Sequence, residues 1–397
     1  MNSTVDFGRY GIAEPDLLLP APGVDAYKWA TVACDQFTQD AEYWNETERI
    51  TGGAPSSLRI TLPEIFLSES ETRTPAMLET MARYLEGGVF TPHTGFILAE
   101  RRFGNRLRRG VMALCDLDSY EYVRGSSALI RASEATVAER LPPRVKVRAE
   151  APLEIPHVMM LYRDEGGELL RAAEPALKSA PLYDTPLMQG GGRLTGYPIG
   201  GECHAGMARA LERMLAVSDG LLFAVGDGNH SLAAAKAVRE ADRNNARNRY
   251  ALCELVNVYD KGLVFEPIHR VACGVDAERL AAEFAAFAEK AGGKNQVRLA
   301  FGGAERRFAL GGPNEPECGA VDAFLAGFGA GSVDYVHGEA EALAAARGGG
   351  RAAFLLGAME KPALFEIVQK RGALPKKCFS MGEAREKRYY FEARRLT

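Results

Sequence analysis

The residues best suited to chemistry lie in one stretch, Leu221 to Glu240, which reads LLFAVGDGNHSLAAAKAVRE. Five apolar residues predict a short buried strand, two glycines interrupt the pattern, and an alanine-rich segment with one apolar face predicts a helix. A strand that leads through a glycine turn into a helix brings backbone N–H groups and the positive end of the helix dipole to one point, which favours an anion. The residues around that point are Gly226, Asp227, Gly228, Asn229, His230 and Ser231.

A basic segment is the second candidate for anion binding. It runs from Arg124 to Arg148 and carries six cations against two acids, in a chain whose net charge is −4. Guanidinium groups bind phosphate and carboxylate through two parallel hydrogen bonds, so the segment predicts either such a site or an ordinary charged surface helix. Pro142 and Pro143 predict the end of a helix over residues 134–140. The candidate phosphate partners are Arg131, Arg140, Arg144 and Arg148.

Other polar residues form a secondary group of candidates, because they follow apolar runs or precede helices, where site residues often lie. This group comprises Cys34, Asp35, Glu202, His204, Glu266, His269 and His337. Three further features have simpler structural interpretations. His157, inside the apolar run IPHVMMLYRD, is expected to be a hydrogen-bonded core histidine, and the arginines of residues 101–109 are expected on a solvated strand face. Lys376, Lys377, Lys387 and Arg388 near the C-terminus either return to an anionic site or are exposed.

The elements that must position these residues alternate in type. GFILAERR and RLRRGVMALCDL, joined by a short FGN connection, predict a β-hairpin, and apolar spacing predicts helices near 74–85 and 277–291. We therefore expect a mixed α/β fold (α+β), with a cleft between the basic segment and the glycine turn. The expected domains are an N-terminal α+β region with hairpins over 1–190, a central unit over 191–275 and a small C-terminal α/β region over 276–397.

Composition excludes several classes of protein. The fractions of 47% hydrophobic and 25% charged residues are those of an ordinary soluble protein, and the acidic balance makes nucleic acid an unlikely partner. No apolar run approaches the roughly 20 residues of a membrane span, and the first residues do not resemble a signal peptide. Seven cysteines without a CxxC pair favour reduced thiols, and hence a cytoplasmic location, over a disulfide framework or structural zinc.

Two resemblances add to this interpretation. Asp227-Gly228-Asn229-His230 resembles the turn of ParB/sulfiredoxin-type proteins, although Ser231 stands where that pattern has an arginine that helps to hold phosphate. Across nearly the whole chain, the blocks EIPHVMMLYRD, VGDGNHSLAAAKA, LVFEPIHRV, DYVHG and LPKKCFSMGEAREKRYY occur in the order typical of the bacterial and archaeal family known as domain of unknown function 1015. Relatives with a ParB-like fold include sulfiredoxins and free-serine kinases, which handle nucleotide phosphates at this turn. The resemblance thus implies phosphate binding at Gly226 to Ser231.

Three hypotheses remain open. The first is an enzyme that binds a nucleotide or a phosphorylated metabolite and transfers or removes a phosphoryl group. Asp227 would be its base or metal ligand, and His230 would be an acid–base group or a hydrogen-bond donor to phosphate. Such an enzyme would bind an anionic small molecule and would require Mg²⁺ with ATP or ADP. No P-loop or kinase signature is present, however. The second is a metabolic enzyme of non-phosphate chemistry that uses the cysteine and histidine candidates. The third is a ligand-binding regulatory protein without catalysis.

Overall fold

The computed structural model describes residues 5–136, 141–155, 157–311 and 316–396. Two compact units make up the chain. The first contains residues 1–132, 136–263 and 384–397, and the second contains residues 133–135 and 264–383. The three expected ranges, 1–190, 191–275 and 276–397, do not coincide with these units, because strands from the first two of them pair in one sheet.

The first unit is built on a mixed sheet. Within the described residues it has ten strands, with β1 (Ile12–Ala13) paired to β5 at the side of the main path. The main path is β10 (Tyr183–Leu187), β11 (Gly192–Pro198), β4 (Ile97–Phe103), β5 (Arg106–Asp116), β13 (Tyr250–Asn257), β9 (Met159–Tyr162), β12 (Phe223–Asp227), β7 (Ile130–Ala132) and β6 (Tyr120–Glu121). The strand β12 runs parallel to β7 and antiparallel to β9. The predicted hairpin is confirmed as β4 and β5, and the predicted mixed α/β class is confirmed.

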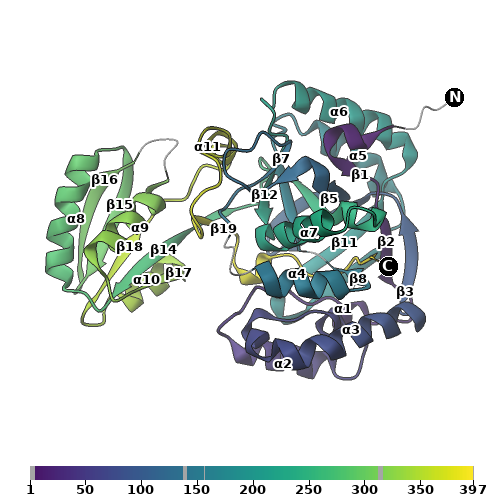
Figure 1. Ribbon diagram of the computed structural model, residues 1–397, viewed down its shortest axis with the longest axis horizontal. Coiled ribbons are helices and arrows are strands. Elements are labelled where there is room, and N and C mark those ends of the chain that lie inside the picture. The colour runs from purple at the N-terminus through teal and green to yellow at the C-terminus, as the bar shows by residue number, and fades with distance from the viewer. Residues whose placement is uncertain (1–4, 137–140, 156, 312–315, 397) are drawn as a thin grey trace. The chain divides into compact units, whose positions relative to one another are not determined.

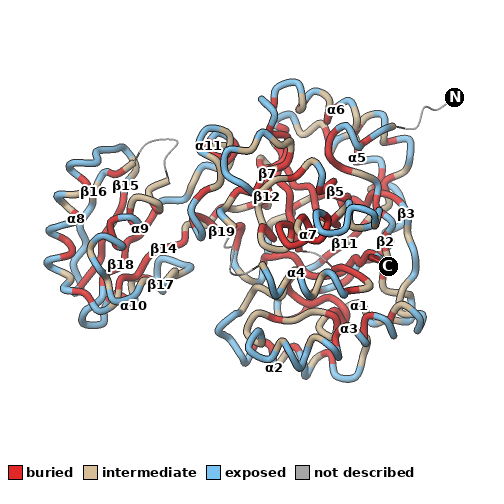
Figure 2. Tube along the Cα trace, in the orientation of Figure 1, coloured by how far each residue is buried: buried red, intermediate tan, exposed pale blue. Residues whose placement is uncertain are grey.

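Alternation along the strands gives this sheet two apolar faces. In β5, Val111 and Ala113 join one core cluster, and Met112 and Leu114 join the other. Figure 2 shows these central strands as buried. The first cluster includes side chains of α5 (Glu168–Ala173), α6 (His204–Ala216) and α7 (Asn229–Ala241). The second includes side chains of α1 (Ala26–Trp29), α2 (Ala41–Thr51), α3 (Ser70–Glu86) and the C-terminal segment 384–396. No helix of the described chain has the length and apolar character needed to cross a membrane.

Three smaller features complete the first unit. Strand β2 (Asp16–Pro20) pairs with β3 (Phe90–Thr94), and β8 (Leu153–Glu154) pairs with β20 (Arg394–Arg395), which fixes the chain end. Helix α4 (Leu141–Glu150) lies alongside α7 (Figure 1). Residues 134–136 of the helix expected over 134–140 are not helical, and residues 137–140 lie outside the described part of the chain. Pro142 and Pro143, the expected stop signal, lie in the first turn of α4. A helix accepts proline in its first turn, where the missing N–H would have no intrahelical partner.

The second unit holds a six-stranded sheet among the residues described there. The strands are β14 (Phe265–Cys273), β15 (Asn295–Phe301), β16 (Ala304–Leu310), β17 (Ser332–His337), β18 (Arg351–Leu355) and β19 (Phe379–Met381). The helices are α8 (Ala277–Ala291), α9 (Glu317–Phe328), α10 (Glu339–Ala345) and α11 (Ala363–Arg371). The predicted apolar face of α8 is confirmed by buried Leu280 and Phe284.

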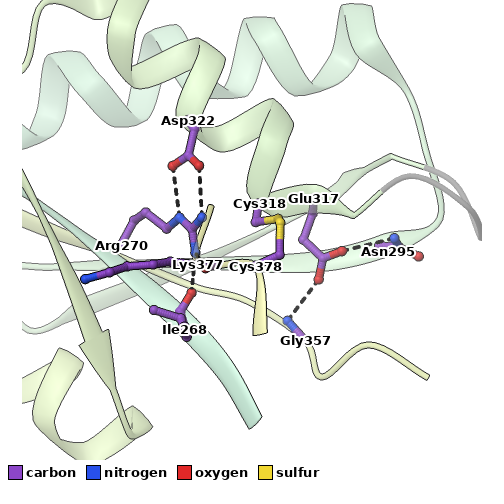
Figure 3. Close-up of a disulfide and its surroundings, with 9 residues drawn as sticks. All are labelled: Ile268, Arg270, Asn295, Glu317, Cys318, Asp322, Gly357, Lys377 and Cys378. Atoms are coloured by element: carbon purple, nitrogen blue, oxygen red, sulfur yellow. Dashed lines mark hydrogen bonds and ion pairs between the residues drawn. A yellow bond between two sulfur atoms is a disulfide. The ribbon is translucent and has the colours of Figure 1, made fainter. Parts of the chain in front are cut away.

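A disulfide ties α9 to the segment before β19 (Figure 3). It joins Cys318 to Cys378, whose Cα atoms are 5.8 Å apart. Beside it, the Arg270 guanidinium donates two hydrogen bonds of 2.9 Å to Asp322 and a third to the carbonyl of Lys377. The expectation that all seven cysteines are reduced thiols is therefore wrong for this pair. The two residues are 60 positions apart, so no local spacing marks them as partners.

Candidate functional site

The glycine turn has the strand–turn–helix form expected from the sequence. Strand β12 ends at Asp227, Gly228 caps the helix with φ of 76°, and α7 begins at Asn229. A Cβ on Gly228 would lie 3.0 Å from the Cα of Val158, so both the backbone angle and the close approach require glycine. The Gly228 N–H donates to Asp227 Oδ1 at 2.9 Å, and the Asn229 amide donates to the Val225 carbonyl. Asp227 directly precedes Gly228, which caps α7 without a side chain. The positive end of the helix dipole therefore stands beside Asp227.

The C-terminal segment brings a lysine to this turn. Lys387 Nζ lies 3.3 Å from Asp227 Oδ2, and the side chains are 10% and 17% exposed. The next residue, Arg388, donates to the buried carboxylate of Glu254 at 2.5 Å. The two alternatives for the basic residues of the C-terminal segment are therefore divided, because Lys387 and Arg388 are buried at this polar cluster whereas Lys376 and Lys377 are exposed. Gly226, His230 and Ser231 are half-buried at the same turn.

A second acid, Asp35, belongs to the same polar cluster. His157 Nε2 lies 3.5 Å from Asp35 Oδ2, and His157 Nδ1 lies 3.0 Å from the Tyr390 hydroxyl. That hydroxyl accepts the Cys34 N–H at 3.1 Å, so its own proton is available to Nδ1. The hydrogen-bond pattern therefore assigns the histidine proton to Nε2, facing the carboxylate.

Asp35 is held in its charged form. Burial alone would raise the pKa of its carboxyl. The electrostatic interaction with His157, the hydrogen bond from Gln36 and the charge of Lys387 together outweigh burial and hold that pKa below its ordinary value. The influence of Lys387 on Asp35, together with its ion pair to Asp227, makes Lys387 the residue that links the two acids.

Buried arginines lie beneath this cluster. Arg101 and Arg108 are cross-strand partners in β4 and β5 and are only 4% and 7% exposed, so the expected solvated strand face is wrong for both. The carboxylate of Glu254 compensates part of the buried positive charge. It lies 3.5 Å from the guanidinium group of Arg108 and 2.5 Å from that of Arg388. Burial, and then the neighbouring Arg108, lowers the pKa of Arg101 to about 10. The alternation that should have exposed these residues fails because the C-terminal segment covers this face of the sheet.

A cavity of about 450 Å³ adjoins the cluster. Its wall includes Cys34, His157, Tyr390 and Ser231, so the cavity and the polar cluster share residues. Three cations of α4 line it, and two of them, the arginines, are already paired, whereas Lys146 is the third. Arg144 bonds Glu64, and Arg148 donates to Glu154 at 2.5 Å.

Several predicted residues are not brought to the turn. Arg131 donates to the carbonyls of Ala128 and Gly220, at the end of the sheet where β12 begins. Arg140 lies outside the described residues. His204 packs against Phe96, next to β4, with Glu202 two residues before it in the chain, and three strands separate β4 from β12. The remaining candidates, Glu266, His269 and His337, belong to the second unit.

Three residues of the cluster were missing from the predicted site: His157, Lys387 and Tyr390. His157 is buried and hydrogen-bonded, as expected for a core histidine, yet it also lines the cavity and faces Asp35. The local signal for the other two was the basic and aromatic run EKRYY at 386–390, which does not reveal its position in the fold.

The described residues contain no group of three or more histidine, cysteine, aspartate or glutamate side chains placed to hold a metal ion. A magnesium ion at this site would therefore take most of its ligands from phosphate oxygens and water, as magnesium ions commonly do in proteins. Asp227 and Asp35 are the nearby carboxylates that could contribute.

Solved structures that resemble this chain do so at low similarity. A C-terminally truncated SbnI from Staphylococcus aureus has a TM-score of 0.37 and 10% identity, covering 68% of this chain and 82% of its own. A free serine kinase variant in complex with AMP has a TM-score of 0.40 and 12% identity, covering 72% and 92%. A conserved hypothetical protein from Pyrococcus furiosus has a TM-score of 0.36 and 13% identity, covering 70% and 97%. At TM-scores below 0.5, these similarities carry no argument about function.

No curated protein matches the sequence. The model of one protein family does match, and it covers residues 18–330, well over half of the chain. The protein therefore belongs to the family described as protein of unknown function, DUF1015.

Proposed function

We propose that the first unit is an enzyme that binds the phosphates of a nucleotide or of a phosphorylated metabolite at the turn Gly226–Ser231 and transfers a phosphoryl group. The observation that carries the proposal is the position of Lys387. Its ammonium group meets Asp227 at the positive end of α7, and its charge also acts on Asp35. A lysine and a helix N-terminus together neutralise phosphate charge, and a nearby carboxylate gives a proton acceptor.

The chemistry follows from these groups. Phosphoryl transfer relies on positioning and on neutralising charge. Lys387 would exchange its contact with Asp227 for a contact with a phosphate oxygen, beside the dipole of α7. The acceptor hydroxyl would lose its proton to the ionised carboxylate of Asp35 as its oxygen bonds to phosphorus, and the bond from phosphorus to the leaving oxygen would break. Asp227 would hold the Mg²⁺ that accompanies the phosphates, and His230 would donate to them.

The structure redistributes the charges available for this task. Arg144 and Arg148 already carry carboxylate partners, so they would serve phosphate only by exchanging them. In this proposal Lys387 would take the role that the ParB-like pattern gives to an arginine after the histidine, where this chain has Ser231. The ParB-like interpretation of the turn thus remains part of the proposal, with the cation supplied by the C-terminal segment.

A thermal-shift screen tests the proposal. The ligands are ATP, ADP, GTP and pyrophosphate, each with and without Mg²⁺, and unfolding is followed by tryptophan fluorescence. Both tryptophans, Trp29 and Trp44, are buried in the first unit, so the signal reports that unit. A ligand at 100 times its dissociation constant stabilises the fold by about 2.7 kcal/mol. We expect this shift in the wild type and in Glu168→Gln, a surface control, and its loss in Asp227→Asn.

Turnover separates this proposal from a regulatory protein without catalysis. We expect Asp35→Asn to keep the ligand-induced shift and to lose phosphoryl transfer. Equal shifts in wild type and Asp227→Asn would reject the turn as the phosphate site. A ligand that binds without any turnover in the wild type would favour the regulatory protein.

A further inference from the structure

The cavity beside the polar cluster is mostly apolar. Aliphatic side chains come to it from α3, from α4, from the strand region 251–252 and from α7. They include Met77, Leu78, Met81, Val147, Leu232 and Leu252. Methionine is flexible and polarizable, so this wall can adapt to a chain. Leu67, which is 39% exposed and also lines the cavity, extends the apolar surface outward.

The wall of the cavity offers little aromatic surface to a nucleobase. Charged and hydroxyl side chains also line it, among them Ser70, Glu71, Lys146 and Glu150. Tyr390 is the one phenylalanine, tyrosine or tryptophan among the described lining residues, and its hydroxyl is already bonded to Cys34 and His157. Among the described lining residues, a base would therefore find no open phenylalanine, tyrosine or tryptophan ring on which to stack.

The cavity nevertheless meets the proposed reaction site. Cys34, His157 and Tyr390 form one hydrogen-bonded chain that leads to Asp35, and all three line the cavity. Ser231, on the first turn of α7, lines it as well. A molecule inside the cavity would therefore have its polar end at the cluster and its remaining atoms against aliphatic side chains.

We propose that the cavity holds the aliphatic chain of an amphiphilic substrate whose phosphate head, before or after transfer, lies at the cluster. The inference rests on the proposed function and adds the substrate class: an alkyl or acyl chain with a terminal hydroxyl or phosphate. The nucleotide would then serve as the other substrate, outside the cavity. Burial of a chain contributes to binding in proportion to its length, because each methylene removed from water adds a similar free energy.

The test is a calorimetric titration with butyl, hexyl, octyl and decyl phosphate, each below its aggregation concentration so that monomers bind. We expect the affinity to rise about fourfold for each added methylene until the cavity is filled. Leu78→Trp fills the cavity from a half-buried position and should bring decyl phosphate back to the affinity of butyl phosphate. Ala76→Trp adds the same ring at an exposed position of the same helix, outside the cavity, and should leave the series unchanged.

The outcomes separate this inference from the proposed function. Equal affinity at every chain length would overturn the chain-binding inference and leave phosphate binding at the turn intact. The same length dependence with neutral alkyl alcohols, together with no gain from the phosphate head, would keep the chain site and reject the phosphate site. Binding of pyrophosphate but of no alkyl phosphate would also overturn the chain-binding inference.

Discussion

Glu254→Gln should severely destabilise the first unit. Glu254 is 1% exposed, and its carboxylate meets Arg388 at 2.5 Å and Arg108 at 3.5 Å. The amide keeps the shape of the side chain but removes the charge, which leaves two buried guanidinium groups with less compensation. Breaking a buried ion pair from one side costs about 3–5 kcal/mol, because the remaining charge stays buried. We expect a loss in that range.

Urea unfolding followed by tryptophan fluorescence measures this loss in the first unit alone. With a slope of about 2–3 kcal/mol/M, the midpoint should fall by at least about 1 M. Glu168→Gln is the matched control, because its partner Arg213 is 58% exposed and surface pairs contribute about 0–1 kcal/mol. An unchanged midpoint in Glu254→Gln would refute the placement of both arginines on one buried carboxylate.

The pH dependence gives a second check. Burial raises the pKa of the Glu254 carboxyl, but the charges of Arg108 and Arg388 outweigh burial and hold it below the ordinary value. A lowered pKa in the folded state means that the ionised carboxylate stabilises the protein above its unfolded pKa of about 4.3. This contribution is lost as the pH falls through the folded value. The difference between wild type and Glu254→Gln should therefore be constant near neutral pH and shrink below about pH 4.

Three further outcomes are expected. Gly228→Ala should destabilise the first unit by about 1–2 kcal/mol from its left-handed backbone alone, and by more from the close contact with Val158; wild-type stability in urea would contradict this. Tyr390→Phe should cost about 1–3 kcal/mol, because it leaves a buried N–H and a ring nitrogen without their partner, and a neutral change in the unfolding midpoint would count against the assigned bonds. In mass spectrometry after alkylation in denaturant, purified protein should show five reactive thiols, and reduction should release Cys318 and Cys378; seven without reduction would deny the disulfide.

Local features were within reach of the sequence. The strand, the glycine turn and the helix at residues 221–241 follow from neighbouring residues, because apolar runs, glycine and alanine-rich periodicity act over short distances. The hairpin of β4 and β5 was predicted for the same reason, since alternating residues and a short connection specify it. The DUF1015 resemblance was likewise carried by blocks of residues that can be read in order, and the family match confirms it.

Long-range features of the fold could not be predicted from the sequence. Lys387 reaches Asp227 across 160 positions, and Tyr390 reaches His157 across 233, so only the folded sheet brings them together. Arg101 and Arg108 look like solvent-facing residues until the C-terminal segment covers them. The stop signal at Pro142 failed because proline has two positional meanings in a helix, and the choice between them depends on what precedes it.

The central claim is that phosphate binds at the turn Gly226–Ser231. The most direct measurement is a titration of glycine-¹⁵N-labelled protein with inorganic pyrophosphate and Mg²⁺, followed through amide chemical shifts. The signals of Gly226 and Gly228 would be assigned by adding a ¹³C-carbonyl label to the residue types that precede them, valine and aspartate, with Gly302 and Gly303 of the second unit as controls. We predict saturable shifts at Gly226 and Gly228, unchanged control signals, and loss of the response in Lys387→Met. Unshifted Gly226 and Gly228 signals during binding elsewhere would contradict the account.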